Sequence, residues 1–398
     1  MREERGEPRN AMASCERAAL EAELLALFAR GVDEEGADAT VSPYSSSLLP
    51  DDRFNELALR VFRHQYEGSR VLRAFWERRG TTPESVSHWT EIPGVLTAAF
   101  REAPLCAFPP EEAAAVFETS GTTAGGRPGR HFLRTLALYE ASLLPTFEAF
   151  LLPDRRPMVM LSLGPNAEAA PRSSLGHMLS LVVGRWGQRS AGGGSRHFQS
   201  AAGLDLEGFR AALRAVQAAG EPVCLLGTTF GFIHWLDTFP NDQFRLAPGS
   251  RLMDTGGTKG RVRDLAPAEL YARYERALGV PADHLVNEYG MTELCSQYYD
   301  VALRTGSGLG HPRPKAGPPW LRTRVVDPET LRPVPDGEVG LLLHFDLANL
   351  DSVLAVQTED LGRLTPKGLQ LLGRATGAEA RGCSLVVEEL MAARRGHD

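Results

Sequence analysis

The stretch of sequence that decides the fold is Phe117-Glu-Thr-Ser-Gly-Thr-Thr-Ala-Gly-Gly-Arg-Pro-Gly-Arg-His131. Its first half holds a run of small or hydroxylated residues, namely Thr119, Ser120, Gly121, Thr122 and Thr123. Glycines let backbone N–H groups approach an oxyanion closely, and hydroxyl groups add donors that carry no charge. The segment lacks the Gly-Lys-Ser/Thr ending of a P-loop, which disfavours a Walker-type ATPase. It therefore predicts a phosphate-binding loop, and a plain surface loop is the alternative.

The part of the chain before this loop has a helical pattern. Apolar residues recur there at intervals of three and four positions, which predicts helices over 15–29, 54–65 and 70–78. Thr82-Pro83 indicates the start of a further helix, because it places an N-cap residue before a proline at the first helical position.

The part after the loop alternates between short apolar runs and a helical pattern. The runs predict strands, and the pattern between two of them predicts a helix: strands at 158–163, 182–186, 223–226 and 251–253, and a helix at 206–219. Strand, helix and strand in that order are typical of parallel-sheet units. Two later runs, 321–326 and 340–345, are separated by the turn signal Pro335-Asp336-Gly337 and predict antiparallel strands.

The composition is that of a globular protein. Of 398 residues, 43% are hydrophobic and 23% charged, which suits two or three domains of roughly 150 residues each. The net charge of -7 argues against nucleic-acid binding through phosphate neutralisation. No apolar run reaches the roughly 18 residues that span a bilayer, and the charged opening is unlike a secretion signal. Five widely spaced cysteines indicate neither a disulfide framework nor a zinc ribbon. We therefore expect a cytoplasmic protein with no nucleic-acid partner and no membrane insertion.

Four short motifs follow the loop: Asp254-Thr-Gly-Gly-Thr-Lys-Gly260, Asn287-Glu-Tyr-Gly-Met-Thr-Glu293, Thr358-Glu-Asp-Leu-Gly362 and Gly373-Arg374. With the loop, and in the same order, they resemble the motifs of the acyl-adenylate-forming enzymes, the ANL superfamily. The resemblance implies an α/β fold whose large N-terminal domain has parallel-sheet αβ subdomains and a small antiparallel β part. It also implies a ligase that uses ATP and Mg²⁺. The loop departs from the family pattern: Ala124 replaces a glycine and no lysine follows, so Arg127 or Arg130 would supply the charge.

The resemblance implies a role for each motif toward ATP. Gly256, Gly257 and Thr258 would line adenine and the acyl carbonyl. In the segment Glu288, Tyr289, Gly290, Met291 and Thr292, the tyrosine would lie against adenine and the threonine would touch phosphate. Glu293 would hold Mg²⁺, Asp360 would accept the ribose hydroxyls, and Arg374 would reach ribose or phosphate. The residue types suit these roles, because an aromatic face offers stacking area and a hard carboxylate suits magnesium.

Two features narrow the resemblance to one branch of the superfamily. Residues 82–101 look like the segment before the phosphate loop in the branch of phenylacetate-CoA ligases and luminescence-type acyl-protein synthetases. Only 24 residues follow Arg374, so most of the small C-terminal domain of other relatives is missing. We therefore expect a helical N-terminal extension at 1–50, an adenylate-forming core at 51–372 and a short C-terminal remnant at 373–398. No lysine lies beyond Lys367, so Lys259, Lys367, an arginine or a partner protein would replace the lysine that relatives carry in that domain.

The expected reaction joins a carboxylic acid, such as a fatty or aryl acid, to AMP and then transfers the acyl group to a thiol of a protein. Cys383 is the candidate acceptor within the chain, because the branch acylates a cysteine near the C-terminus and Arg381 would favour the thiolate; a buried, inert cysteine is the alternative. Phe230, His234 and Trp235, with Gly256, are candidates for the acid pocket.

Two other functions stay open at this point. An acyl-CoA ligase would deliver the acyl group to pantetheine, and a nucleotide-binding subunit without catalysis would serve a biosynthetic complex. The expected partners are the carboxylic acid and an acyl-acceptor protein or thiol, with a homo-oligomer or a complex with a partner enzyme as further expectations.

Overall fold

The computed structural model describes residues 7–32, 49–120, 127–256, 265–306 and 310–375. Within these residues twelve strands form one continuous sheet, in the order β15-β16-β17-β18-β14-β13-β12-β11-β10-β4-β7 with β1 added beside β17. Helices cover the sheet, and no described helix is long and apolar enough to cross a bilayer. The predicted α/β fold class is therefore confirmed.

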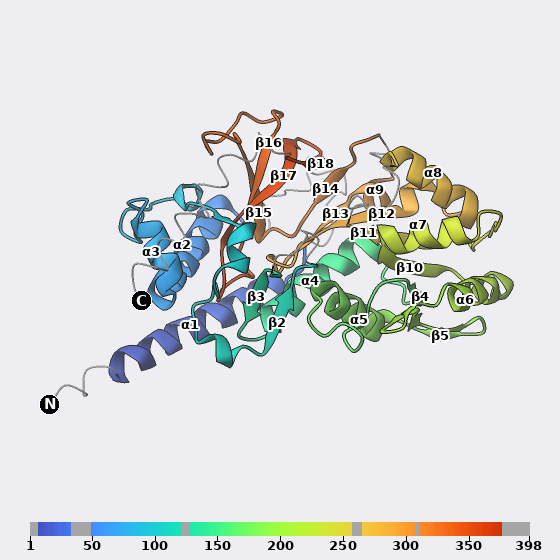
Figure 1. Cartoon of the computed structure of the whole chain (residues 1–398), viewed down its shortest axis with the longest axis horizontal. Helices are drawn as coiled ribbons and strands as arrows, with labels where there is room; N and C mark the ends of the chain where they lie inside the picture. The colour runs from blue at the N-terminus through green and yellow to red at the C-terminus, as the bar shows by residue number, and fades with distance from the viewer. Residues whose placement is uncertain (1–6, 33–48, 121–126, 257–264, 307–309, 376–398) are drawn as a thin grey trace.

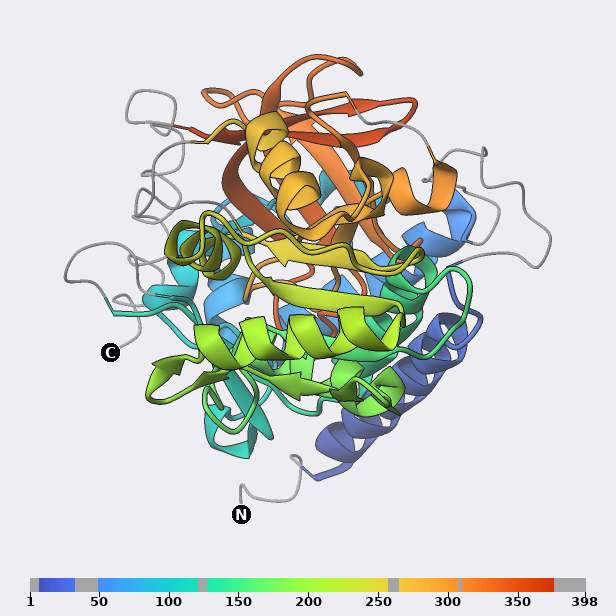
Figure 2. The same cartoon turned by 90° about the vertical axis from the view of Figure 1, so that its right-hand side faces the viewer.

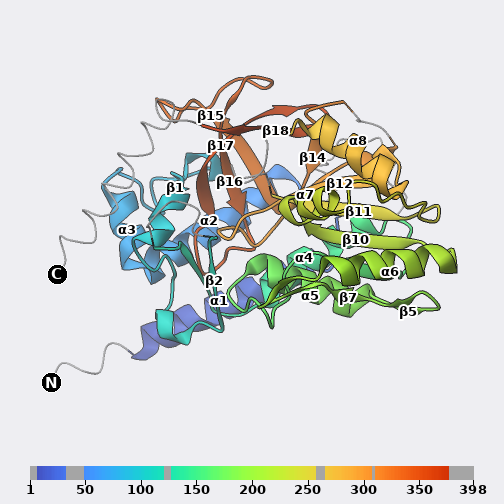
Figure 3. The same cartoon turned by 45° about the vertical axis from the view of Figure 1, so that its right-hand side comes forward.

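One half of the sheet is parallel (Figure 1). Its strands are β7 (Arg196–His197), β4 (Val159–Ser162), β10 (Val223–Thr228), β11 (Arg251–Thr255) and β12 (Leu285–Tyr289). Successive side chains of a strand point to opposite faces. Met160 and Cys224 accordingly pack with helices α4 (Ala137–Leu151) and α5 (Ser174–Trp186). Leu161 and Leu225 pack with α6 (Leu206–Ala219), α7 (Thr229–Thr238) and α8 (Pro267–Leu278), which Figures 2 and 3 show along these strands.

The other half of the sheet is antiparallel and begins at β12. Its strands are β13 (Tyr298–Asp300), β14 (Pro314–Ala316), β18 (Gly368–Arg374), β17 (Ala355–Thr365), β16 (Gly340–Asp346) and β15 (Leu321–Val326). Strand β1 (Val95–Leu96) pairs in parallel with β17. The antiparallel pair predicted at 321–326 and 340–345 is confirmed as β15 and β16. Strand β12 is thus the junction between the two halves.

Shorter elements complete the described chain. Strands β2 (Ala115–Glu118) and β3 (Arg130–Leu133) lie on either side of the predicted phosphate loop, and they pair antiparallel. The remaining elements are the hairpins of β5 (Arg189–Ser190) with β6 (Gly193–Gly194) and of β8 (Gln199–Ser200) with β9 (Gly203–Leu204), the helix α9 (Ala302–Thr305), and the 3-10 helices η1 (Trp89–Glu91), η2 (Thr97–Arg101), η3 (Pro110–Glu112) and η4 (Ala282–His284).

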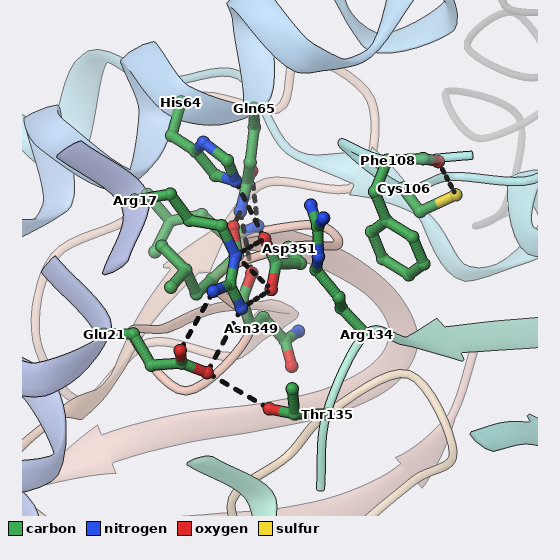
Figure 4. Close-up of polar contacts among 12 residues, drawn as sticks. Arg17, Glu21, His64, Gln65, Cys106, Phe108, Arg134, Thr135, Asn349 and Asp351 are labelled. Carbon is green, nitrogen blue, oxygen red and sulfur yellow. Dashed lines mark hydrogen bonds and ion pairs between the residues drawn. The ribbon is translucent and has the colours of Figure 1, made fainter. Parts of the chain in front are cut away.

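The N-terminal helices are integral to the core. Helix α1 (Glu7–Phe28) inserts Leu24 and Phe28 into the main hydrophobic cluster, where the Phe28 ring stacks on Trp320 with centroids 4.3 Å apart. Helix α2 (Asp51–Gly68) is followed by α3 (Arg70–Glu77). Figure 4 shows how α1 and α2 hold the loop after β16: Arg17 donates from Nε to Asp351 Oδ1 at 2.8 Å, and His64 Nε2 lies 2.9 Å from the same oxygen. The loop that precedes β17 is therefore fixed from two helices at once.

Two predicted elements are wrong. Val182 and its neighbours to Trp186 belong to helix α5 and not to a strand, because Ser173 Oγ accepts from Gly176 N at 3.0 Å and caps a helix whose buried face includes Val182. No helix starts at Pro83. The Ser85 hydroxyl accepts from the backbone N–H of Thr82 at 2.8 Å and closes a tight turn there instead.

Candidate functional site

The candidate site lies at the junction of the two halves of the sheet. Parallel strands β10, β11 and β12 present their carboxyl ends at one edge, which is where ligands bind in open α/β sheets. Thr229, at the start of α7, donates from its hydroxyl to Gly256 O at 2.9 Å and so ties the end of β10 to the turn after β11. The predicted residues Gly256 and 288–293 are neighbours at this edge because their strands are paired.

Glu288 is a buried tie between two of these strands. The Thr255 hydroxyl, directly opposite in the β11–β12 register, donates to the Glu288 carboxylate. Burial raises the pKa of Glu288 to about 7. Position 290 requires glycine, because a Cβ there would come within 2.3 Å of Glu288 Oε1. The glutamate therefore links strands β11 and β12 at the start of the predicted nucleotide segment, and its carboxyl group occupies the space that a side chain at position 290 would need.

Tyr289, Asp360 and Arg374 form one hydrogen-bonded group. Tyr289 donates from its hydroxyl to Asp360 Oδ2 at 2.8 Å, and Arg374 donates from Nε to Asp360 Oδ1 at 3.1 Å. Asp360 and Arg374 face each other in the β17–β18 register. The side chain of Asp360 is 14% exposed and that of Arg374 is 72% exposed. Three residues predicted to contact ribose or adenine from separate motifs thus lie together.

The turn that carries Thr292 and Glu293 is held from three elements. His131 on β3 lies with Nδ1 2.7 Å from Thr292 O, and Asn349 donates from Nδ2 to Glu293 O at 2.9 Å. Asp346, at the end of β16, accepts from the backbone N–H groups of residues 295 and 296 at 3.0 and 2.9 Å. The His131 contact also links this turn to the strand that follows the phosphate loop.

The Glu293 carboxyl is buried next to positive charge. Its exposed fraction is 6%, and burial raises its pKa to about 7, an effect that the guanidinium groups of Arg374 and Arg101 partly offset. No cluster of three or more His, Cys, Asp or Glu side chains that could hold a metal exists in the described chain. Magnesium is commonly held by one or two carboxylates together with substrate phosphates, so a single buried carboxylate fits this ion.

Hydrogen bonds between Thr119 and Gly129 join the two sides of the phosphate loop. Thr119 donates from its backbone N–H to Gly129 O at 2.9 Å, and its hydroxyl accepts from Gly129 N at 2.9 Å. Within the loop the structure describes the residues up to Ser120 and those from Arg127 onward. Several predicted site residues lie outside the described residues: Gly121, Thr122, Thr123, Gly257, Thr258 and Cys383.

The candidates for the acid pocket separate into two groups. Phe230, 41% exposed, stacks on His234 on the outer side of α7, with ring centroids 6.1 Å apart. Trp235 is 1% exposed and packs against Phe209 and Phe244 in the core beneath α7. The structure therefore does not bring Trp235 together with the other two.

Four residues that sequence reasoning missed contribute to this site. They are His131, Asp346, Arg101 and His344, which lies with Nε2 3.2 Å from the Tyr289 hydroxyl. His131 and Arg101 are the last residues of the segments 117–131 and 82–101, but neither was predicted to have a role, and Asp346 and His344 belong to no motif. One sequence signal was available, because His344 interrupts the apolar run of β16, and a polar side chain buried in such a strand needs hydrogen-bond partners.

Comparisons with known proteins give consistent matches. The family "acyl-protein synthetase, LuxE" matches residues 43–392. A long-chain-fatty-acid–luciferin-component ligase of Vibrio harveyi is 22% identical over 85% of this chain and 88% of its own length. A protein of the same name from Aliivibrio fischeri is 47% identical over 40% of this chain and 41% of its own.

Solved structures share the fold. The crystal structure of 2-hydroxyisobutyryl-CoA ligase in the postadenylation state is 17% identical, with a TM-score of 0.57 over 88% of this chain and 74% of that chain. Other solved structures that match are longer, and this chain spans about half of their length.

Proposed function

Because the chain belongs to the LuxE acyl-protein synthetase family, we propose that it uses ATP to activate a fatty acid as acyl-AMP and then transfers the acyl group to a protein thiol. The family and the general class of function, an acyl-protein synthetase-type ligase, agree with what the sequence predicted. The long-chain fatty acid is proposed from the names of the relatives in Vibrio harveyi and Aliivibrio fischeri.

One observation carries the proposal: side chains from distant motifs meet at one edge of the sheet. Tyr289 and Arg374 both hydrogen-bond to Asp360, while His131, next to the phosphate loop, contacts the backbone of Thr292. A triphosphate nucleotide needs this combination, because its ribose, base and phosphates extend over several strands. This arrangement supports a single ATP site made from all the motifs.

In the proposed first step the fatty acid carboxylate attacks the α-phosphorus of ATP. An oxygen–phosphorus bond forms, and the bond to pyrophosphate breaks. The protein mainly positions the reactants: Asp360 accepts the ribose hydroxyls, and the Thr292 hydroxyl donates to the α-phosphate. Arg374 lies beside Asp360 and adds positive charge. Glu293 would hold Mg²⁺, which when bound neutralises charge on the phosphates.

In the proposed second step a thiolate attacks the acyl carbon, a carbon–sulfur bond forms, and AMP leaves. Three cysteines of the described chain are unsuited to this role because burial raises their thiol pKa, to about 11 for Cys106, to about 12 for Cys224 and well above the ordinary value for Cys295. Cys15 is exposed. Cys383, or a thiol of a partner protein, remains the proposed acceptor.

The first step is tested by ATP–pyrophosphate exchange with a long-chain fatty acid. Glu293→Gln keeps the shape of the side chain and removes the charge, so we expect exchange to fall by about 10²-fold or more. Glu111→Gln, on the exposed 3-10 helix η3, is the matched control and keeps full exchange. Exchange at the wild-type rate in Glu293→Gln would refute the magnesium assignment.

The second step is tested with a radiolabelled fatty acid and mass spectrometry. We expect ATP-dependent label on the wild-type chain and none on Cys383→Ser, with pyrophosphate exchange intact in both. Cys15→Ser is the control and keeps the label. A thioester formed on added CoA would favour an acyl-CoA ligase, and ATP binding without pyrophosphate release would favour a subunit without catalysis. Assembly as an oligomer or with a partner enzyme stays a prediction.

A further inference from the structure

A chain of hydrogen bonds runs through the antiparallel half of the sheet and ends at Asp360. The Tyr298 hydroxyl lies 2.5 Å from Thr323 Oγ1, and Thr323 Oγ1 lies 2.8 Å from His344 Nδ1. His344 Nε2 lies 3.2 Å from the Tyr289 hydroxyl, and that hydroxyl lies 2.8 Å from Asp360 Oδ2. Four contacts thus connect five side chains.

The register of the strands explains why these side chains meet. Tyr289 lies opposite Tyr298 in the β12–β13 pair, and Thr323 lies opposite His344 in the β15–β16 pair. Asp360 lies opposite Arg374 in the β17–β18 pair. The hydrogen bonds therefore join three cross-strand pairs that the ladders bring together.

The direction of the hydrogen bonds follows from the acceptor at the end. A carboxylate only accepts, so Tyr289 donates its single hydroxyl proton to Asp360. The Tyr289 oxygen can then only accept, which requires a proton on His344 Nε2. Burial lowers the pKa of His344 to about 3, so the ring is neutral near pH 7 and its Nδ1 carries no proton. Nδ1 therefore accepts from Thr323, and Thr323 accepts from Tyr298.

Asp360 keeps room for a ligand in this arrangement. A carboxylate offers about four lone-pair positions, and Tyr289 and Arg374 occupy one on each oxygen. Among the residues that the structure describes, no other side chain is seen to bond to these oxygens. One position on each oxygen therefore remains for a ligand, which suits two adjacent hydroxyl groups. The orientation of the carboxylate is set from one side by Arg374 and from the other by Tyr289.

We infer that His344 is a positioning residue for nucleotide binding: its Nε2–H holds the Tyr289 hydroxyl, which in turn orients Asp360 toward the two ribose hydroxyls of ATP. His344 is 0% exposed, so it acts through Tyr289 and not by contact with the nucleotide. The inference rests on the proposed function, because it requires that ATP binds at Asp360. It assigns His344 a role in the selection of ribose over deoxyribose.

The test compares ATP with 2′-deoxyATP and 3′-deoxyATP in binding titrations and in pyrophosphate exchange. His344→Leu removes the donor to Tyr289. We expect KM for ATP to rise by about tenfold, which corresponds to the loss of one hydrogen bond between a ribose hydroxyl and the charged Asp360 carboxylate. KM for the deoxynucleotides should change little, because they lack one of the hydroxyls that Asp360 orients. The rate at saturating ATP should stay within about twofold, since the phosphates are held by other residues.

Two further variants sharpen the test. His344→Gln keeps an N–H donor near the Nε2 position and should restore the preference for ATP. Tyr289→Phe removes only one oxygen atom, so it tests the same link even if His344→Leu does not fold, and it should lose the preference in the same way.

Equal weakening of ATP and both deoxynucleotides in His344→Leu or Tyr289→Phe would overturn the positioning role and leave a structural one. So would an unchanged ATP preference in both variants. Failure of the wild-type chain to bind any of the three nucleotides would overturn the proposed function as well, and the wild-type titration distinguishes that outcome from the others.

Discussion

Acid should destabilise this protein through His344, and the size of the effect follows from its burial. The ordinary pKa of histidine is 6.5, and burial lowers that of His344 to about 3 in the folded chain. Between these values the unfolded chain binds one proton more than the folded chain, so the free energy of unfolding falls as the pH falls. The stabilisation is therefore fully present above pH 6.5 and is lost progressively toward pH 3.

A modest change of pH already alters the free energy of unfolding measurably. From pH 7 to pH 5 the loss is about 2 kcal/mol for a group whose pKa falls from 6.5 to about 3 on folding. His344→Gln removes the titrating ring and keeps a donor for Tyr289. We therefore expect the free energy of unfolding to fall by about 2 kcal/mol more in the wild-type chain than in His344→Gln over this range.

Urea unfolding at pH 7, 6 and 5, followed by tryptophan fluorescence, measures the difference. Thr323→Ser is the control, because it keeps both the histidine and the hydroxyl that donates to its Nδ1, and its pH dependence should match that of the wild type. Parallel pH dependence in the wild type and His344→Gln would refute the reasoning, since it would mean that the ring titrates alike in both states.

Three other substitutions test how the site is held. Asp346→Asn replaces an acceptor oxygen with an N–H donor that faces other donors, including the Ser296 N–H. The free energy of unfolding, measured by urea denaturation, should therefore fall by about 2–4 kcal/mol, and the rate of pyrophosphate exchange should fall as well. Arg17→Met leaves Asp351 without its guanidinium partner. Amide hydrogen exchange in α1 should accelerate, and the free energy of unfolding should drop by about 3 kcal/mol. An unchanged rate of amide hydrogen exchange would contradict the packing of α1 against the loop after β16. Gly290→Ala would place a Cβ 2.3 Å from a buried carboxylate oxygen, so we expect a loss of about 1–3 kcal/mol in thermal or urea unfolding.

The sequence predicted the class of fold because hydrophobic periodicity is a local property. Helix α6 has the bounds that the pattern predicted, and so does strand β15. The same reasoning failed at Val182, where an apolar run within a helix has the composition of a buried strand. Apolar runs of this length are ambiguous, and the cap at Ser173 decides between the two structures.

The motifs could also be found in the sequence, because a motif for phosphate or ribose is a short run of glycines, hydroxyls and carboxylates in a fixed order. The sequence by itself thus indicated which segments are candidates for nucleotide binding. It could not indicate that Tyr289 bonds to Asp360, which lies 71 positions along the chain. Nor could it indicate that His344 supports this bond from another strand.

These contacts were decided only by the tertiary structure, because strand register sets which side chains lie opposite one another. A shift of one residue would turn Thr323 or His344 to the other face of the sheet and break the hydrogen bond between them, and a shift of His344 would also break its bond to Tyr289. The local sequence supplies the hydroxyl, imidazole and carboxylate groups. The pairing of β12 with β13, of β15 with β16 and of β17 with β18 brought them within hydrogen-bond distance.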